Sequence, residues 1–142
     1  MNKKTTKCMV LIIAILMAIT IANAQIISGL NLGDYRSNVT TFLTNKGYTV
    51  KRATSNVSEA SGGLYAGIVL VYYNNKLVTY IVGTNYYQCQ DILANMLYKY
   101  GDPVWNGMYT WSLPGNKYCT ASQTEGIYVF TAIDGNYTDY AT

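Results

Sequence analysis

The chain repeats a set of residues at a spacing of 54 positions, and this repeat constrains the fold more than any other feature. Five residues recur at that spacing: Gly29, Asn31, Leu43, Gly47 and Val50 match Gly83, Asn85, Leu97, Gly101 and Val104. Self-similarity at a fixed spacing is the signature of a repeated structural unit. We therefore expect two repeats, about residues 29–82 and 83–136. A coincidence of common helix-ending signals is the alternative.

Each repeat is expected to begin with an amphipathic helix. The first should follow Asp34 as its N-cap and end at Gly47, where glycine takes the left-handed conformation that closes many helices. The second should follow Asn85, which forms a capping box pattern with Gln88, and end at Gly101. The expected apolar stripes are Tyr35, Val39, Phe42 and Leu43 in the first helix, and Cys89, Ile92, Leu93, Met96, Leu97 and Tyr100 in the second.

Three strands should follow each helix. The expected strands are 48–53, 64–73 and 76–82 in the first repeat, with 54–63 as a polar loop, and 108–113, 117–123 and 127–134 in the second. Asn74-Asn75, Pro114-Gly115 and Glu125-Gly126 provide turn signals between them. The predicted fold is α+β: two tandem αβββ units, with an antiparallel meander sheet and two helices packed on one face.

Alternation along the strands predicts which side chains share a face. Residues 64–73 are apolar at both odd and even positions, which indicates a strand inside the sheet. We expect the helices to cover the face that carries Cys119, Ala121, Val129 and Ile133. Tyr118 and Tyr128 should then lie on the opposite, open face.

Short motifs give the chain a resemblance to known proteins. The segments Gly29-Leu-Asn-Leu-Gly33, Lys46-Gly47 and Lys99-Tyr-Gly-Asp-Pro103, with Trp105 and Trp111 downstream, resemble small exported proteins of Bacteroides-type bacteria. The tandem helix-plus-meander plan resembles the beta-lactamase inhibitor protein fold, in which a concave, aromatic-rich sheet binds a protein partner. The present repeats are shorter, with one helix each instead of a pair. The resemblance implies an architecture and no inhibitory residues.

The first 24 residues have the pattern of a signal peptide. Lys3, Lys4 and Lys7 precede an apolar run, and Ala22-Asn23-Ala24 supplies the small residues that signal peptidase recognises. The apolar run of about 13 residues is short of the roughly 20 that span a bilayer. We expect cleavage before Gln25, no membrane insertion afterwards, and a single periplasmic or secreted domain of residues 25–142. An uncleaved membrane anchor is the alternative.

Charge and residue inventory exclude several functions. Three of the ten Lys and Arg residues lie in the predicted signal peptide, which leaves seven against seven Asp and Glu. A neutral domain has no general attraction to nucleic acid. The chain has no His, which excludes a Ser-His-Asp site and a His-ligated metal. We therefore expect no cofactor, no metal and no catalytic site. A hydrolase using carboxylates, Asp91 with Asp102 or Glu125 with Asp134, is the remaining enzymatic alternative.

Aromatic side chains are the best candidates for a binding surface. Tyr and Trp give large contact areas at low entropic cost. The predicted binding residues are Trp105, Tyr109, Trp111, Tyr118 and Tyr128. Burial of Trp111 in the core is the alternative for that residue. The predicted function is a non-enzymatic binding module that contacts a protein or a glycan through an aromatic-rich sheet face. A structural component of an envelope assembly is the alternative.

Two cysteines outside the predicted signal peptide form a candidate disulfide. Cys89 lies on the apolar stripe of the second expected helix, and Cys119 lies on the inward face of a strand. An exported protein meets an oxidising environment. We therefore expect a Cys89–Cys119 disulfide in the core, with two buried thiols as the alternative.

Overall fold

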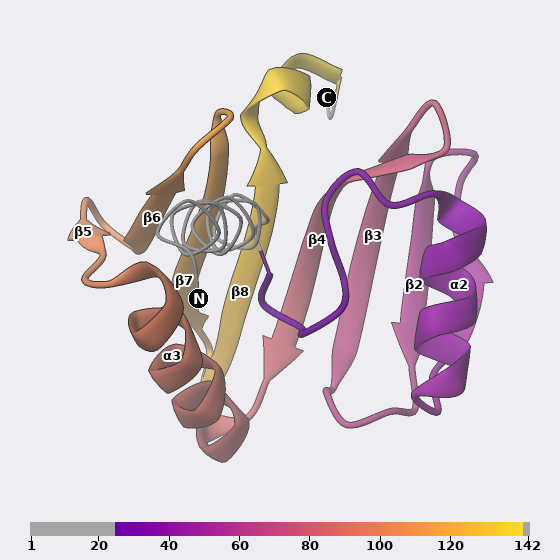
Figure 1. Cartoon of the computed structure of the whole chain (residues 1–142). Helices are drawn as coiled ribbons and strands as arrows, with labels where there is room; N and C mark the ends of the chain where they lie inside the picture. The colour runs from indigo at the N-terminus through magenta and orange to yellow at the C-terminus, as the bar shows by residue number, and fades with distance from the viewer. Residues whose placement is uncertain (1–24, 141–142) are drawn as a thin grey trace, which may run out of the picture.

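The computed structural model describes residues 25–140, so the predicted signal peptide lies outside the described residues. Over these residues the fold is α+β, as predicted, with two α-helices and one eight-stranded antiparallel sheet (Figure 1). In chain order the elements are α2 (Arg36–Asn45), β1 (Thr49–Arg52), β2 (Val57–Ser61), β3 (Gly67–Tyr73), β4 (Lys76–Thr84), α3 (Tyr86–Tyr100), β5 (Val104–Trp105), β6 (Tyr109–Leu113), β7 (Lys117–Thr124), β8 (Ile127–Asp134) and the 3₁₀-helix η1 (Gly135–Tyr140).

The strand order places the ends of the two meanders at the centre of the sheet. The order is β1-β2-β3-β4-β8-β7-β6-β5, so β4 pairs with β8 and the short strands β1 and β5 form the two edges. Across the central pair, Ile81 lies opposite Thr131 and Tyr80 lies opposite Ala132. Two segments about 50 residues apart therefore form the middle of the molecule.

Each helix precedes four strands, so the predicted αβββ unit is wrong by one strand. The first missed strand, β2, lies in the segment predicted as a polar loop. Its buried residues are Ser58, which is polar, and Ala60, which is small, so the segment shows no clear alternation of hydrophobic residues. The second, β5, has only two residues, and both are exposed.

Local signals at the helix ends and turns are mostly confirmed. Asn85 and Gln88 form the predicted capping box, and Gly47 has the expected positive φ of 91°. The hairpin turns Asn74-Asn75 and Glu125-Gly126 also have positive φ at both positions. The predicted Asp34 cap is wrong, because Tyr35 is the N-cap of α2 and makes no side-chain cap bond. An Asp34 carboxylate oxygen instead accepts a bond from the backbone N–H of Asn31 at 3.0 Å.

The core is built from buried residues of both helices and from one set of alternate strand residues. In Figure 1, α2 and α3 lie in front of the sheet, over its two halves. The buried residues of the helices are Val39 and Leu43 in α2, and Cys89, Ile92 and Met96 in α3. The buried strand residues include Ile68, Leu70, Tyr80, Val82, Cys119, Ala121, Phe130 and Ala132.

The register corrects the predicted faces of β8. Cys119 lies opposite Ala132, and Ala121 lies opposite Phe130. Phe130 and Ala132 are therefore the β8 residues that enter the core, and Val129 and Ile133 point to the other side. The prediction that Val129 and Ile133 face the core is wrong. This strand has apolar residues at both odd and even positions, so only its pairing with β7 determines which of the two sets is buried.

Residues 25–35 form an N-terminal strap that the sequence did not predict. The strap runs between α2 and α3 in front of the centre of the sheet (Figure 1), and buries Ile26, Leu30 and Leu32. Its backbone binds the fully buried Tyr80: the N–H of Ile26 donates to the hydroxyl at 2.8 Å, and the hydroxyl donates to the carbonyl of Leu30 at 3.2 Å. The strap therefore completes the core between the two helices.

None of the helices among residues 25–140 has both the length and the apolar character needed to cross a bilayer.

Candidate functional site

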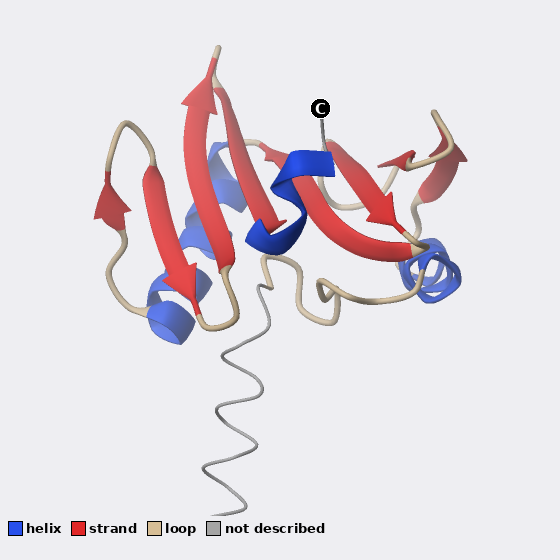
Figure 2. Ribbon diagram, turned by 90° about the horizontal axis from the view of Figure 1, so that it is seen from above, coloured by secondary structure: helices blue, strands red, loops and turns tan. Residues whose placement is uncertain are grey.

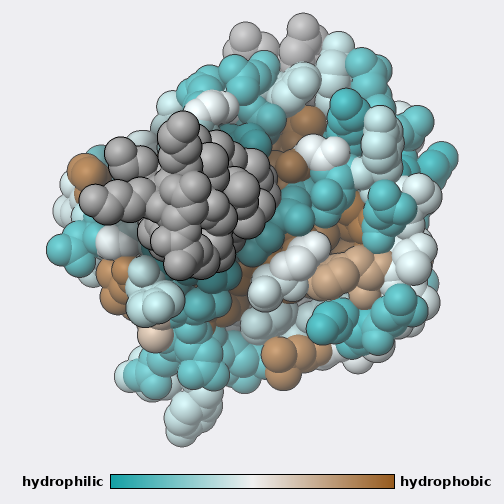
Figure 3. All heavy atoms as spheres, viewed as in Figure 1, coloured by the Kyte–Doolittle hydropathy of each residue, from teal (hydrophilic) through white to brown (hydrophobic). Residues whose placement is uncertain are grey.

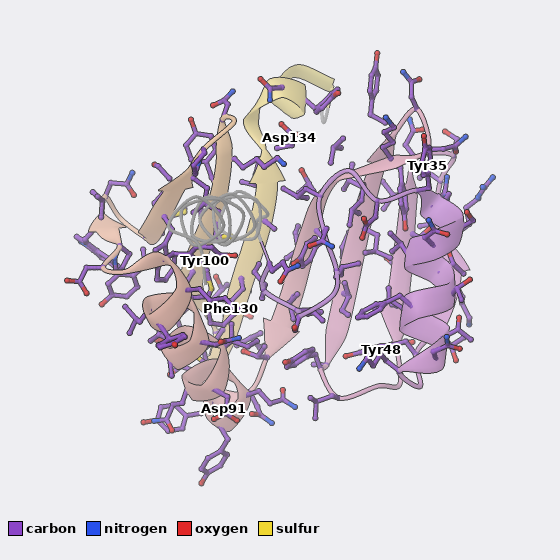
Figure 4. The ribbon with its side chains drawn as sticks, in the orientation of Figure 1. Tyr35, Tyr48, Asp91, Tyr100, Phe130 and Asp134 are labelled. Atoms are coloured by element: carbon purple, nitrogen blue, oxygen red, sulfur yellow. The ribbon has the colours of Figure 1, made fainter. Side chains whose placement is uncertain are left out.

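An aromatic pocket of about 390 Å³ opens between α3 and the C-terminal half of the sheet. We use this name for the hollow lined by Cys89, Leu93, Trp105, Tyr109, Ala121, Gln123, Tyr128 and Phe130. Cys89 and Leu93 come from α3, and the other residues come from β5 to β8. Figure 4 shows Phe130 on the sheet beside α3.

Strand register explains why a hollow forms at this position. Trp105, Tyr109, Ala121 and Phe130 are consecutive partners across β5, β6, β7 and β8. Directly opposed residues in neighbouring strands lie within about 5.5 Å of each other. The small Ala121 therefore leaves space between the rings of Tyr109 and Phe130. The adjacent row adds Gln123 and Tyr128, which are also opposite each other.

The mouth of the aromatic pocket is exposed and its floor is buried. Trp105 and Tyr109 are 65% and 45% exposed, and their rings meet edge to face with centroids 4.9 Å apart. Phe130 and Cys89 are only 1% and 8% exposed. The ring of Tyr128 also contacts the half-exposed Tyr86 of α3, with centroids 6.0 Å apart. A ligand could therefore pass exposed rings and reach an apolar floor.

The electrostatics of the aromatic pocket favour a neutral ligand. None of its lining residues is charged, and its polar groups are the Tyr hydroxyls, the amide of Gln123 and the hydroxyl-bearing Ser122 beside it. Burial raises the pKa of the Cys89 thiol above its ordinary value. The thiol therefore stays protonated near neutral pH, which makes it a poor nucleophile and a small apolar wall.

Of the five predicted binding residues, the structure brings three together. Trp105, Tyr109 and Tyr128 line the aromatic pocket. The prediction that Tyr128 lies on the open face is wrong, because the pairing of β8 with β7 places Tyr128 on the same face as Phe130. Tyr118 does lie on the open face, where its hydroxyl donates to the side-chain carbonyl of Asn116 at 2.7 Å.

Trp111 is a core residue, so its prediction as a binding residue is wrong. It is 3% exposed, and its indole N–H donates to the carbonyl of Gly101 at 2.8 Å. Its partner in the sheet is Cys119, which is also buried. The bond to the end of α3 satisfies the only polar group of the side chain, so complete burial carries no polar penalty.

The predicted disulfide is absent, because Cys89 and Cys119 are both buried free thiols. Cys89 lies against the Ala121 and Phe130 row as part of the aromatic pocket, whereas Cys119 belongs to the next row with Trp111 and Ala132. A disulfide requires Cβ atoms about 4 Å apart. Cys89 lines the aromatic pocket and Cys119 does not, so the two thiols lie in different parts of the core.

Sequence reasoning missed Leu93, Ala121 and Phe130 as parts of the site. Leu93 and Phe130 look like ordinary core residues, and Ala121 matters only because large rings flank it across the strands. A row of large, small and large side chains becomes visible only when the register of three strands is known.

No carboxylate among residues 25–140 lines the aromatic pocket. No group of three or more His, Cys, Asp or Glu residues is arranged to hold a metal ion among residues 25–140. Asp91 and Asp102 are exposed, and neither lines the aromatic pocket. Figure 4 shows Asp91 near the lower end of α3, on the side away from Tyr100.

Comparison with known proteins gives no match: no protein-family model matches the chain, and no curated protein or solved structure is significantly similar to it. The candidate site is therefore argued from its own geometry.

Proposed function

We propose that the protein is an exported, non-enzymatic binding module whose aromatic pocket receives an apolar side chain of a protein partner. The observation that carries this proposal is the combination of exposed Trp105 and Tyr109 at the mouth with the buried floor of Phe130 and Cys89. Binding energy in protein interfaces is concentrated where an anchor side chain fills such a desolvated pocket. A volume of about 390 Å³ accommodates a side chain of any size.

A protein partner fits the aromatic pocket better than a glycan does. A sugar ring presents several hydroxyl groups, and each needs a hydrogen-bond partner when it leaves water. The amide of Gln123 is the main side-chain group available besides the Tyr and Ser hydroxyls, and the lining has no carboxylate. An apolar side chain makes no such demand, so it gains the burial energy without leaving polar groups unpaired.

The same features support a binding role over a catalytic one. The chain has no His, the lining carries no charge, and burial raises the pKa of the Cys89 thiol. General acid-base and nucleophilic catalysis both need a group that can exchange protons near neutral pH. A hydrolase using carboxylates would need two of them in one cleft.

The sheet edges disfavour the alternative of an assembly built by strand addition. The edge strand β5 has two residues, and β1 has four, of which Lys51 and Arg52 are exposed cations. Short, charged edge strands are the usual protection against pairing with another sheet.

Export is part of the proposal. The first described residue, Gln25, follows the predicted cleavage site, and its backbone N–H donates to the Tyr100 hydroxyl at 3.0 Å. Gln25 is therefore part of the folded domain, and the predicted signal peptide places that domain in the periplasm or outside the cell. The intact mass of the exported protein should correspond to a start at Gln25. A mass that includes residues 1–24 would contradict cleavage at this position.

We also propose that the chain consists of two tandem units with both helices on one face of the sheet, a plan that resembles the beta-lactamase inhibitor protein fold. Each half consists of one helix followed by a four-stranded meander, and the halves meet at β4 and β8. The equivalent hairpin turns Asn74-Asn75 and Glu125-Gly126 share positive φ angles. Figure 2 supports the common side, since α2 and α3 lie below the sheet in that view.

The binding proposal can be tested with peptides selected on residues 25–142 from a displayed random library. We expect the selected peptides to share one aromatic or large aliphatic residue, whose replacement by Ala weakens binding by about 2 kcal/mol or more. Trp105→Ala should weaken the same peptides at least tenfold.

The matched control is Tyr98→Ala, because Tyr98 is a 90% exposed aromatic residue of α3 that does not line the aromatic pocket. This variant should bind the peptides as well as the unmodified protein does. Equal binding to the Trp105→Ala variant, or selected peptides with no common apolar residue, would contradict the proposal.

A further inference from the structure

The turn between β5 and β6 contains the only Asn-Gly pair of the sequence, Asn106-Gly107. The turn connects Trp105 to Tyr109, the strand partners whose rings form the mouth of the aromatic pocket, and Gly107 itself lines the pocket. Asn106 is exposed. Figure 1 places β5 at the edge of the sheet, and in Figure 3 this edge is an open surface of mixed hydrophilic and hydrophobic residues. Water therefore reaches the turn.

The backbone nitrogen of Gly107 is free to react. Its N–H has no hydrogen-bond partner among residues 25–140. Gly107 has a φ of 96°, and apart from its chain neighbours no heavy atom lies within 4 Å of the position that a Cβ would occupy. The pair Asp134-Gly135 differs in this respect, because the N–H of Gly135 donates to the carbonyl of Asn116 at 2.7 Å. The fold therefore protects one of these two glycine nitrogens and leaves the other accessible.

The side-chain carbonyl of Asn106 accepts a hydrogen bond that would assist attack on it. The Thr110 hydroxyl donates to the Asn106 Oδ1 at 3.3 Å. When a nucleophile adds to the amide carbon, this oxygen becomes an oxyanion. A donor already aimed at a developing oxyanion lowers the barrier to its formation. Thr110 therefore acts on Asn106 as an oxyanion donor.

We propose that Asn106 is a deamidation site whose modification changes the mouth of the aromatic pocket. The Gly107 nitrogen attacks the Asn106 Cγ, so that an N–Cγ bond forms, the Cγ–Nδ2 bond breaks, and the backbone amide proton leaves with the amine as ammonia. Water then opens the cyclic imide at either of its carbonyls. Opening at one carbonyl gives aspartate, and opening at the other gives isoaspartate, in which the backbone runs through one additional carbon.

Either product adds a negative charge beside a neutral pocket, since none of the lining residues is charged. A partner that closes over the mouth removes water from the new carboxylate, and the burial of an unpaired charge is costly. In isoaspartate the longer backbone also changes the spacing between Trp105 and Gly107, which both line the pocket. The modification therefore weakens binding as the protein ages, a consequence that rests on the proposed function.

The modification is tested by ageing residues 25–142 at mildly alkaline pH and locating new aspartate and isoaspartate by peptide mapping and mass spectrometry. We expect Asn106 to react before any other Asn, and at least as fast as in a synthetic peptide of residues 104–110, because the fold leaves the Gly107 N–H unprotected. Asp134 should form no isoaspartate over the same period. A slower reaction of Asn106 in the folded protein than in the peptide would overturn the proposal.

Variants of Thr110 test the role of its hydroxyl. Thr110→Val keeps the branched shape and removes the donor, so it should slow deamidation about fivefold, the equivalent of one hydrogen bond worth about 1 kcal/mol. Thr110→Ser keeps the hydroxyl and should react as the unmodified protein does. Circular dichroism establishes that both variants fold. Equal rates in Thr110→Val and the unmodified protein would contradict the assignment of Thr110 as an oxyanion donor.

The effect on binding is measured with the peptides selected on the unmodified protein. The deamidated fraction, separated by ion exchange through its extra negative charge, should bind these peptides about tenfold more weakly, which corresponds to about 1.4 kcal/mol. The matched control is Asn106→Gln, which has a neutral amide and a longer side chain, and which should keep its affinity when aged in parallel. Unchanged affinity of the deamidated fraction, or an equal loss in Asn106→Gln, would overturn the effect on the pocket. The mass measurement decides the modification itself, whether or not the pocket binds peptides.

Discussion

Two tryptophans six residues apart occupy opposite environments. Trp105 belongs to an edge strand and is 65% exposed, whereas Trp111 lies inside the sheet and is 3% exposed. Both point to the same face of the sheet, because Trp105 is the partner of Tyr109, and Tyr109 and Trp111 are alternate residues of β6. Position across the sheet, and not side-chain type, therefore decides which tryptophan is available for binding.

Replacement of Trp111 by Ala should destabilise the protein by about 3 to 5 kcal/mol, because it opens a cavity in the core. The substitution also leaves the Gly101 carbonyl without the indole N–H that binds it at 2.8 Å. Urea unfolding followed by circular dichroism measures the change in the free energy of unfolding. Trp105→Ala is the control and should cost less than about 1 kcal/mol, as exposed substitutions usually do. Equal losses in the two variants would contradict the assigned environments.

Buried thiol and phenol groups should make the fold sensitive to alkali. Burial raises the pKa of Cys119 to about 12 from an ordinary value of 9.0, and it also raises the pKa of Tyr80 above 10.0. Above pH 9 the unfolded chain loses the Cys119 proton while the folded chain keeps it, so ionisation favours the unfolded state.

We therefore expect the free energy of unfolding to fall from about pH 9 upward, by about 1.4 kcal/mol per pH unit for each such group. Tyr80 adds its share above pH 10. Urea midpoints measured from pH 7 to 11 provide the test. Cys119→Ala should reduce the decline that begins at pH 9, to which the Cys89 thiol with its raised pKa still contributes, and should keep the part that begins near pH 10. A flat profile up to pH 11 would be inconsistent with protonated, buried groups.

At the scale of elements, the capping box of α3 is the clearest local determinant. The Asn85 side chain accepts from the Gln88 N–H at 2.9 Å, and the Gln88 side chain accepts from the Asn85 N–H at 3.2 Å. Asn85→Ala should destabilise the protein by about 1 kcal/mol. Asn95→Ala, an exposed position inside the same helix, should be neutral or stabilising by about 0.5 kcal/mol. Thermal unfolding of both variants compares them, and the opposite ranking would contradict the capping role.

The N-terminal strap should contribute to stability as a core element does. Leu30 is 0% exposed between the two helices, so Leu30→Ala should cost about 2 to 5 kcal/mol. Leu64→Ala is the matched control, because Leu64 is 70% exposed and should change stability by less than about 0.5 kcal/mol. Urea unfolding gives both values. A loss below 1 kcal/mol for Leu30→Ala would show that the strap is not part of the cooperative fold.

Elements encoded by local signals were predictable from sequence, and those encoded by pairing were not. The α3 capping box and the Asn74-Asn75 turn depend on neighbouring residues, so their patterns are visible in the chain. The strap has no periodic pattern of its own. The strand β2 depends on its neighbours for burial of Ser58 and Ala60. The side of β8 that carries Phe130 is set by distant partners, so Tyr128 on the same side was assigned to the wrong face.

At the scale of the whole molecule, the α+β class and the two α-helices of residues 25–140 were predictable from sequence, but the strand order was not. Nothing local in residues 76–84 specifies residues 127–134 as their neighbours. The β4–β8 pairing is set by the burial of Tyr80, Val82, Phe130 and Ala132 on one common face. Pairing of strands that are distant in sequence costs more chain entropy than formation of a hairpin, because a longer loop must close before the stabilising contacts form.

The central position of the last strand also sets the order in which the molecule can be completed as it is synthesised. The helix α2 and the first meander exist in the growing chain long before residues 127–134 are added, and until then β4 is an edge. This edge is nine residues long and is buried at five positions in the finished fold. Long, apolar, unpaired edges recruit strands from other chains. Any chain that stops before residue 127 therefore exposes a template for aggregation that the complete chain seals with its own C-terminal strand.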